Sequence, residues 1–410
     1  MKSVNKKVAL VLGGTVPHIE LIKQLQDRGY YTILVDYLDD SPARPYANEH
    51  IQESTLDQEA VLKIASERNA ALVISSAIDQ ANITCCYVAE KLGLPHPYSY
   101  ETALNVTHKD RMKRIMVENG VPTAPYVTAD EVESFEDAGV GFPCVVKPTN
   151  SNGSKGVRVV NNRDELREYL PLARKASRTG EAIVEAFVNG TEVSSYFYVQ
   201  DSQAYLLSTC QKANYTSYSK NAVRQYESVI YPAQVPACAQ GKLVDAANRI
   251  AKAFNLNSTP LFLQAIVDNS GNVSVLEFAP RLGGGMCFRS IPLLTGFDYI
   301  SASIASFIGE RLTPPLLVAN ACWLMIGNMF ARPGVFDHVE GVEDAVANGI
   351  VSEFHAIKAK GGEIGTDGSS GSRFGQFIVV GESINELLAK DEQARKLIKA
   401  FDASGNELSY

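Results

Sequence analysis

Two neighbouring apolar segments contain the pair of residues with the most specific chemistry. Segments 261–268 and 273–281 are typical of strands, and the turn-forming run 269–272 between them predicts a β-hairpin. In such a hairpin, Gln264 and Glu277 project from one face of adjacent strands. Two side-chain oxygens on apolar strands make a poor core, but they suit Mg²⁺, which prefers oxygen ligands. The alternative is a surface hairpin with one polar face.

Residues that suit phosphate groups lie upstream of this hairpin. Lys147 ends the apolar segment 143–148, so its ammonium is expected at the strand end, although a lysine that reaches solvent gives the same pattern. The loop 149–156 is rich in small residues, which let backbone N–H groups approach phosphate oxygens, and a flexible hairpin tip is the alternative. Its candidate contacts are Gly153, Ser154 and Gly156. The loop lacks the spacing of a Walker A motif.

The segment 182–193 combines an apolar strand with a glutamate, an aromatic residue and a bend. Its backbone after Glu185 is suited to hydrogen bonding with adenine, and Glu192 is suited to accept from ribose hydroxyls. Taken alone, either glutamate is better explained as solvated charge at a strand edge. Lysine, glycine loop, hinge, ribose acid and oxygen pair nevertheless occur in the order that a nucleotide site requires. Arg281, four residues after Glu277, is placed to face a phosphate.

The composition excludes several classes of protein. With 410 residues the chain is long enough for two or three domains, and its net charge of −8 argues against non-specific nucleic-acid binding. The seven cysteines form no C-x-x-C pair and are expected to be reduced core thiols. No secretory signal and no apolar run long enough to span a bilayer is recognisable, so we expect a cytoplasmic protein without a membrane partner.

The chain divides by its pattern of elements. Residues 1–105 alternate strand and helix, which predicts a doubly wound parallel sheet. Gly13 and Gly14 suggest a dinucleotide turn, but the G-x-G-x-x-G fingerprint is absent, so a tight strand-to-helix turn is the preferred interpretation. Residues 182–320 are typical of an antiparallel sheet with helices. The change in composition at 313–315 predicts a boundary before a tail of strands and one final helix, at about 384–400.

Together these motifs resemble the ATP-grasp superfamily over nearly the whole chain. Within it the sequence is similar to carboxylate–amine ligases, including L-amino-acid ligases, and to the synthetase halves of the carbamoyl phosphate synthetase large subunit. The matching runs are THKD (107–110), GVPT (120–123), VVKP (145–148), GSKG (153–156), VEAF (184–187), GTE (190–192) and LEFAPRLGG (276–284). The run GSRFGQFIVVG (371–381) resembles the C-terminal region of amino-acid ligases, although its alternation also fits a half-buried strand.

The resemblance implies a mixed α/β and α+β architecture. It implies a Rossmann-like pre-ATP-grasp domain over 1–105 and a two-part ATP-grasp domain over 106–312, divided into 106–180 and 181–312. A C-terminal α+β lid or support domain would cover 313–410. Implied nucleotide contacts, in addition to the loop glycines and serine, are Lys109, Lys147, Glu185, Ala186, Phe187, Val188, Glu192 and Leu276.

The resemblance also implies the metal site and one departure from the family pattern. Gln264 and Glu277 match the metal-ligand positions, and a glutamine at the first position is typical of the carbamoyl phosphate branch. The family usually has asparagine two residues after the glutamate, where this chain has Ala279. A second metal ion therefore lacks one expected ligand. The implied cofactors are ATP and Mg²⁺, with Mn²⁺ as an alternative ion.

The predicted activity is the joining of a carboxylic acid to an amine through an acyl phosphate, with an amino acid as one substrate. Glu277, Lys147 and Arg281 are the expected catalytic residues, and Arg281 would stabilise the acyl phosphate. Glu227, Arg289 and Gly284 are candidate substrate contacts, although Arg289 is equally suited to pair with a protein acid. Around Glu227, the segment 212–231 contains further candidates, Tyr215, Tyr218, Lys220, Arg224 and Tyr226. Alternatives are a bicarbonate-using enzyme of the carbamoyl phosphate or carboxylase type and a non-catalytic nucleotide-binding relative. The partners are small molecules rather than nucleic acid, and a homodimer is compatible with the sequence.

Overall fold

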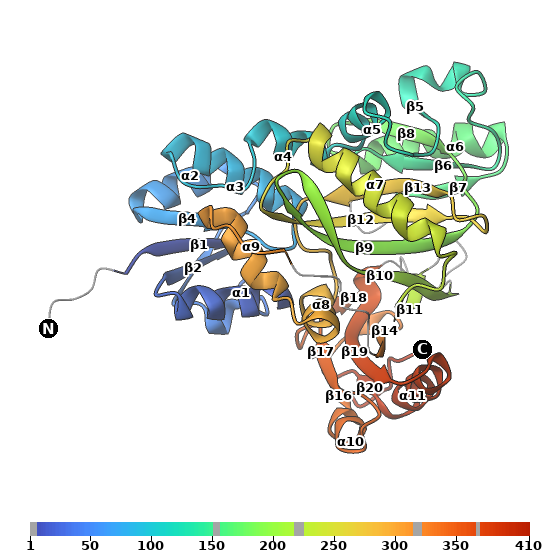
Figure 1. The fold of residues 1–410 in the computed structure, drawn as a ribbon. Coiled ribbons are helices and arrows are strands. Elements are labelled where there is room, and N and C mark those ends of the chain that lie inside the picture. Colours follow the sequence, from blue (N-terminus) through green and yellow to red (C-terminus); the bar gives the residue numbers. More distant parts are fainter. Residues whose placement is uncertain (1–5, 151–155, 217–224, 315–321, 366–369) are drawn as a thin grey trace, which may run out of the picture.

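The computed structural model describes residues 6–150, 156–216, 225–314, 322–365 and 370–410 (Figure 1). The N-terminal part is a parallel sheet with helices on both sides, in the strand order β3-β2-β1-β4. Its elements are β1 (Val8–Leu12), α1 (Val16–Asp27), β2 (Tyr31–Asp36), β3 (Glu49–Gln52), α2 (Gln58–Glu67), β4 (Ala70–Ile74) and α3 (Asp79–Leu92). The central strands are almost wholly buried, as expected when helices cover both faces of a parallel sheet.

A second, antiparallel sheet follows, in the order β5-β8-β6-β7. Its elements and the helices around it are α4 (Tyr100–Thr107), α5 (Lys109–Glu118), β5 (Tyr126–Thr128), β6 (Cys144–Pro148), β7 (Arg158–Val160), α6 (Arg163–Ala176) and β8 (Ala182–Ala186). Helix α6 begins at a cap in which the Asn162 side chain accepts from the backbone of Glu165, and it packs on a separate small core beneath the sheet. Residues 151–155, which include Gly153 and Ser154, lie outside the described residues.

The largest sheet is antiparallel and has the order β13-β12-β9-β10-β11-β14-β19-β17. Its first part comprises β9 (Thr191–Gln200), β10 (Gln203–Thr216), β11 (Gln225–Tyr231), α7 (Cys238–Ala253), β12 (Thr259–Val267), β13 (Val273–Ala279), α8 (Cys287–Thr295) and α9 (Tyr299–Ile308). The tail contributes β14 (Trp323–Phe330), β15 (Gly334–Val335), β16 (His338–Glu340), α10 (Val342–Ala347), β17 (Glu353–Ala356), β18 (Glu363–Ile364), β19 (Arg373–Gly381), α11 (Ile384–Leu397) and β20 (Lys399–Phe401). Because β14, β17 and β19 pair into this sheet, it continues across the predicted boundary at 313.

The predicted hairpin at the edge of this sheet is confirmed. Strands β12 and β13 are antiparallel, and Gln264 lies directly opposite Glu277. In the turn, the Asp268 carboxylate accepts from the backbone N–H groups of Ser270 and Asn272, while Gly271 has a φ of +73°. A left-handed conformation of this kind favours glycine, which explains why the turn closes at this position.

The tail strand β19 differs from its expected half-buried pattern. Most of its residues are buried on both faces, because β14 and β17 flank it and α11 covers it. The final helix is confirmed, and it ends at Leu397. The prediction for the cysteines holds for most of them: all seven are free, although Cys238 is exposed.

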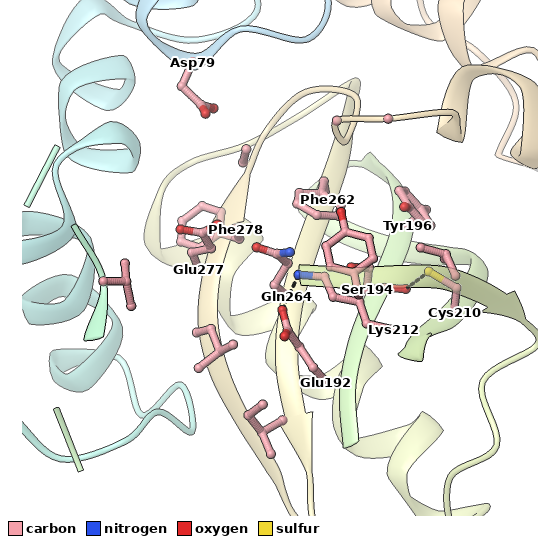
Figure 2. A pocket seen from close by; sticks show the side chains of 18 of the residues that line it. Asp79, Glu192, Ser194, Tyr196, Cys210, Lys212, Phe262, Gln264, Glu277 and Phe278 are labelled. Carbon is pink, nitrogen blue, oxygen red and sulfur yellow. Dashed lines mark hydrogen bonds and ion pairs between the residues drawn. The ribbon is translucent and has the colours of Figure 1, made fainter. Parts of the chain in front are cut away.

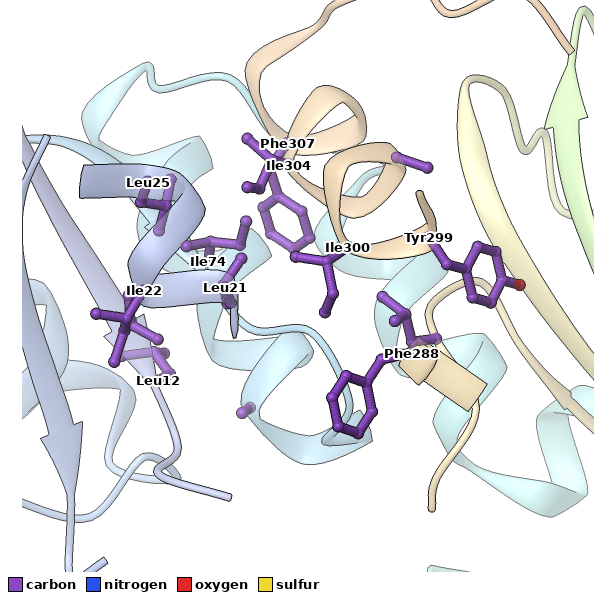
Figure 3. Packing of buried hydrophobic residues seen from close by; sticks show 14 of the residues in the cluster. Leu12, Leu21, Ile22, Leu25, Ile74, Phe288, Tyr299, Ile300, Ile304 and Phe307 are labelled. Atoms are coloured by element: carbon purple, nitrogen blue, oxygen red, sulfur yellow. The ribbon is translucent and has the colours of Figure 1, made fainter. Parts of the chain in front are cut away.

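Helices α8 and α9 attach the central sheet to the N-terminal part. Leu21, Ile22 and Leu25 of α1 share one buried cluster with Ile300 and Ile304 of α9 (Figure 3). This cluster extends from the parallel sheet to the floor of the large sheet, so the two parts are held by continuous apolar packing. Among the described residues, no single helix is long and apolar enough to cross a bilayer, and α8 with α9 passes that test only as a pair bent by 108°.

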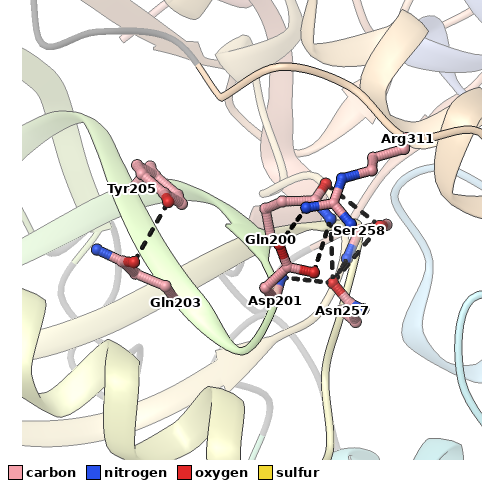
Figure 4. Close-up of polar contacts among 7 residues, drawn as sticks. All are labelled: Gln200, Asp201, Gln203, Tyr205, Asn257, Ser258 and Arg311. Carbon is pink, nitrogen blue, oxygen red and sulfur yellow. Dashed lines mark hydrogen bonds and ion pairs between the residues drawn. The ribbon is translucent and has the colours of Figure 1, made fainter.

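The far end of the large sheet is closed by a polar cluster around the β9–β10 turn (Figure 4). Asp201 and Ser202 have φ values of +53° and +58°, which is typical of a tight hairpin turn. The Asn257 side-chain oxygen accepts from the backbone of Asp201 at 2.7 Å and of Ser258 at 2.8 Å, and Arg311 pairs with the Asp201 carboxylate. These contacts fix the register of β9 and β10, whose opposite ends form the site described below.

Candidate active site

A cavity of about 640 Å³ lies where the two antiparallel sheets meet the N-terminal part. Its wall includes residues of α5, of the end of β8, of the strands β9, β10, β12 and β13, and of β19 in the tail. The structure places thirteen of the predicted residues in this wall: Lys109, Lys147, Glu185, Ala186, Phe187, Val188, Glu192, Tyr226, Gln264, Leu276, Glu277, Arg281 and Gly284. Residues from six separate stretches of sequence therefore converge on one space.

The predicted oxygen pair lies on the floor of the cavity (Figure 2). Oriented to satisfy its neighbours, the Gln264 amide donates to Glu277 Oε1 at 2.6 Å and accepts from Lys212 Nζ at 3.1 Å. On its other side, Glu277 Oε2 lies 3.3 Å from Lys109 Nζ. The nearby ammonium of Lys109 lowers the pKa of Glu277 and outweighs burial, which would raise it, so this carboxylate is ionised at neutral pH.

These residues fit one hard cation. Glu277 supplies a charged carboxylate, Gln264 an amide oxygen that a rotation of the side chain would expose, and the side chain of Glu277 is 40% accessible from the cavity. The ammonium of Lys109 already lies where positive charge is favoured. Ala279, in place of the usual asparagine, is buried and apolar. The described residues contain no cluster of three or more acidic, histidine or cysteine side chains that could hold a metal ion.

The glutamate of the predicted hinge has a different partner from the one expected. The carboxylate of Glu185 is 3% exposed and is held by Lys147 Nζ at 2.6 Å and by Lys113 Nζ at 3.3 Å. Burial alone would raise the pKa of Glu185, but Lys113 and Lys147 lower it to about 2. The Glu185 side chain therefore pairs with two lysines, and Phe187 and Val188, beyond the end of β8, line the cavity.

The predicted ribose acid, Glu192, forms an ion pair with Lys212 on the neighbouring strand β10 (Figure 2). The ammonium of Lys212 also lies 4.6 Å from the ring centre of Tyr226. Burial alone would lower the pKa of Lys212, but Glu192 together with Tyr226 raises it, so the lysine remains charged. Glu192, Lys212 and Gln264 thus form a continuous polar strip from the hinge side of the cavity to the oxygen pair.

The side chain of Arg281 forms an ion pair with a residue of the N-terminal part, Asp79. Its Nε and Nη2 donate to the two oxygens of Asp79 at 2.6 and 2.5 Å, in the fork geometry typical of a strong arginine–carboxylate pair. Asp79 is the first residue of α3, and both residues line the cavity. The guanidinium therefore lies at the cavity wall, with its orientation set by a residue 202 positions earlier in the chain.

The structure places several predicted residues away from the cavity. Arg289 donates to both oxygens of Glu353 at 2.9 and 3.2 Å, so it pairs with a protein acid, as its second interpretation anticipated. Glu227 is not among the described residues of the cavity wall, and its backbone oxygen accepts from Arg395. Both lie next to strands of the tail, because Arg289 pairs with Glu353 of β17 and Glu227 is on β11, which pairs with β14. The nearby candidates Tyr218, Lys220 and Arg224, together with the side chain of Tyr215, lie outside the described part of the chain.

Gly156 has a structural reason to be glycine. Its φ is +71°, and a Cβ added there would lie 2.8 Å from Pro148 Cγ. The next residue, Val157, lines the cavity, whereas Gly156 is not among the described residues of its wall. The predicted phosphate contact at Gly156 stays a prediction.

Sequence reasoning missed several functional candidates. Lys113 lies one helical turn after Lys109 on α5, a spacing that places the two on one face and that could have indicated it. No sequence motif around Asp79 indicates that it contacts Arg281. Arg373 and Gln376 reach the cavity from β19, and Arg373 Nε is a buried donor without a hydrogen-bond partner among the described residues.

Two segments of the chain match known domain families. Residues 140–290 match the ATP-grasp domain, and residues 329–400 match the L-amino acid ligase C-terminal domain 2. A formate-dependent phosphoribosylglycinamide formyltransferase of Burkholderia cenocepacia (strain HI2424) is 26% identical over 350 residues, which cover 82% of this chain and 83% of that protein. The corresponding protein of Methanocaldococcus jannaschii is 30% identical over 185 residues, covering 44% and 47% of the two chains.

Solved structures agree at the level of the fold. The L-amino acid ligase from Bacillus licheniformis superimposes with a TM-score of 0.79 at 19% identity, over 97% of this chain and 99% of that one. The N5-carboxyaminoimidazole ribonucleotide synthetase from Thermotoga maritima gives a TM-score of 0.74 at 19% identity over the same shares. The chain therefore contains one segment, 140–290, that matches the ATP-grasp domain and another, 329–400, that matches the L-amino acid ligase C-terminal domain 2, and it shares the fold of these solved structures.

Proposed function

We propose that this protein is an ATP-dependent ligase that joins a carboxylic acid to an amine through an acyl phosphate and releases ADP and phosphate. The observation on which the proposal depends is the single cavity that collects the Gln264–Glu277 oxygen pair, the cations Lys109 and Lys147, and Arg281. The activity agrees with the ligase-type relatives of the chain. A carboxylate resists attack by an amine because it is anionic and has a poor leaving group, and conversion into an acyl phosphate removes both obstacles.

The adenosine end of ATP is assigned to the hinge. Phe187 and Val188 line the cavity beyond the end of β8, and their backbone groups would exchange hydrogen bonds with adenine. Phe187 is 40% exposed, so its ring is free to cover the base. Glu192, on the next strand, is within the same wall and would accept from the ribose hydroxyls.

The phosphate end is assigned to the floor and to α5. Glu277 and Gln264 would hold Mg²⁺, which neutralises charge on the phosphate oxygens when it is bound. Lys109 lies beside this pair and Lys147 lines the same cavity, and both would hold the phosphates in line with the incoming acid. Because phosphoryl transfer needs positioning and charge stabilisation more than covalent help, fixed cations of this kind are what the reaction requires.

The organic acid is assigned to the far side of the oxygen pair, next to Arg281. An acid oxygen attacks the γ-phosphorus, the bond to the β,γ-bridging oxygen breaks, and ADP leaves. The guanidinium, oriented by Asp79, would then face the acyl phosphate and later the tetrahedral oxyanion that the amine forms. Gly284 and Gly285, next along the wall, leave room there for a substrate.

The tail supports an amino acid as one substrate. Arg373 and Gln376 of β19 border the same cavity, and the unpaired Nε of Arg373 among the described residues suits an anionic group. The match of residues 329–400 to the L-amino acid ligase C-terminal domain agrees with this assignment. The cytoplasmic location and the homodimer stay predictions, which cell fractionation and light scattering of the purified protein would test.

A phosphate-release screen tests the proposal. Purified protein with ATP and Mg²⁺ is offered amino acids singly and in pairs, together with small acids, and products are identified by mass spectrometry. We expect ADP release that requires both an acid and an amine, with a new amide among the products. Bicarbonate-stimulated release without an amine would instead indicate a carboxylase-type enzyme, and ATP binding without release across the panel would indicate a non-catalytic relative.

A further inference from the structure

Glu185 is shared by two lysines that differ in their access to the cavity. Lys147 Nζ lies 2.6 Å from Glu185 Oε2 and Lys113 Nζ lies 3.3 Å from Glu185 Oε1. Lys147 is 13% exposed and lines the cavity, whereas Lys113 is 1% exposed and is not among the described residues of the cavity wall. The Glu185 carboxylate therefore lies between Lys147, which can contact a ligand in the cavity, and Lys113, which cannot.

Lys113 is also fixed from behind. Its ammonium donates to Thr123 Oγ1 and approaches the backbone oxygen of Val275 at 3.4 Å. Thr123 Oγ1 donates to the same oxygen at 2.8 Å, and the Val275 N–H donates to Pro122 O at 2.7 Å. Lys113 thus joins α5, the start of the second sheet and β13, the strand that contains Glu277.

The charges decide what Lys147 can offer a ligand. Burial would raise the pKa of Glu185, but Lys113 and Lys147 lower it to about 2, so the carboxylate is ionised. A single lysine on this carboxylate would form a neutral pair, whose attraction for an anion is weak. With both lysines present, the group of three has a net charge of +1, and the cavity side of it is the ammonium of Lys147.

We propose that Lys113 is a positioning residue for nucleotide binding: it neutralises Glu185 from the buried side, so that Lys147 acts on the phosphates as an uncompensated cation. This inference rests on the proposed function only in taking ATP as the ligand. The role belongs to a residue that itself touches neither nucleotide nor substrate. It explains why a costly buried lysine lies behind the hinge rather than an apolar side chain of similar length.

The substitution Lys113→Met tests the proposal by comparing two ligands. Kd is measured by calorimetry for MgATP and for adenosine, which has no phosphate. In the variant Glu185 retains Lys147 as its partner, and we expect MgATP to bind about tenfold or more weakly while the Kd for adenosine changes less than twofold. A purely structural disturbance of the hinge would weaken both ligands alike, and that result would overturn the proposal.

The double variant Lys113→Met/Glu185→Gln provides the matched control. Removal of the carboxylate charge leaves Lys147 uncompensated again, so the Kd for MgATP should return to within about threefold of the wild-type value. Failure of this rescue, with both variants melting as cooperatively as the wild type, would refute the role. If Lys113→Met does not fold, the double variant provides the test by itself. A Kd for MgATP near the wild-type value would then support the proposal, and loss of MgATP binding would refute it. Wild-type protein that binds no MgATP would contradict the proposed function itself.

Discussion

Replacement of Glu277 by glutamine removes a charge from the oxygen pair while it preserves the size of the side chain. In the structure Glu277 both offers its carboxylate to the cavity and holds Lys109 at 3.3 Å. The variant should therefore have opposite effects on two measurements. Binding of ATP without a metal should improve, because Lys109 is released, whereas the effect of Mg²⁺ and the rate of ADP release should fall.

The magnitudes follow from the geometry. Opposite charges 3.3 Å apart interact by about 5 kcal/mol at an effective dielectric constant of 20, but exposure of the Glu277 side chain and screening reduce the usable part to about 1 kcal/mol. Metal-free ATP should then bind about fivefold more tightly to the variant. Loss of one electrostatic contact in the transition state costs about 3–4 kcal/mol, so ADP release should fall by a few hundredfold.

Calorimetry with ATP, with and without Mg²⁺, measures the first effect and needs no second substrate. Coupled detection of ADP, with an acid–amine pair from the screen, measures the second. Glu192→Gln is the matched control, because Glu192 is a cavity carboxylate that pairs with Lys212 and should keep the full response to Mg²⁺. If Mg²⁺ strengthened ATP binding to the Glu277 variant as much as to the wild type, or if turnover stayed within tenfold, the assigned role of Glu277 would be wrong.

Arg281→Ala should lower the rate of ADP release by a few hundredfold with little change in the Kd for ATP. Asp79→Asn should lower that rate less, because the guanidinium remains but loses its fixed orientation. Stopped-time ADP assays in which Asp79→Asn was the slower enzyme would contradict this ranking. Arg289→Ala should leave ADP release within about twofold, since Arg289 pairs with Glu353, and its measurable effect should be a melting temperature lowered by a few degrees. His18 is fully buried, and burial lowers its pKa to about 4, below the ordinary value of 6.5. Since the unfolded chain takes up a proton first, the stability that neutral His18 allows is complete above pH 6.5 and is lost as the pH falls towards 4, by roughly 3 kcal/mol in total. Urea titrations across this range should show that slope, and His18→Gln should flatten it.

Much of the candidate site could be predicted because its parts are local. A strand repeats its side-chain direction every two residues, and a short turn fixes the register, so the pairing of Gln264 with Glu277 follows from the hairpin alone. The order of Lys147, the hinge and Glu192 along the chain likewise reflects consecutive elements of one subdomain. The structure adds that these stretches line a common cavity, which their order suggested but could not place in space.

Contacts between distant segments were beyond such reasoning. Asp79 begins a helix of the N-terminal part, and nothing near it in sequence indicates that it meets Arg281. The side chain of Glu185 gave no sign of its buried partner Lys113, because that contact depends on how α5 packs behind β8. The tail was expected as a separate unit, yet β14, β17 and β19 extend the large sheet and bring Arg373 to the cavity.

The amino-acid sequence by itself determined the elements, the hairpin register and the chemical types of the nucleotide site, since these depend on periodicity, turn residues and motif spacing. Only the tertiary structure decided which charges neutralise one another, which arginine faces the cavity and which pairs with a protein acid. The physical reason is that ion pairs form between side chains brought together by packing, and the burial that sets their strength is a property of the whole fold.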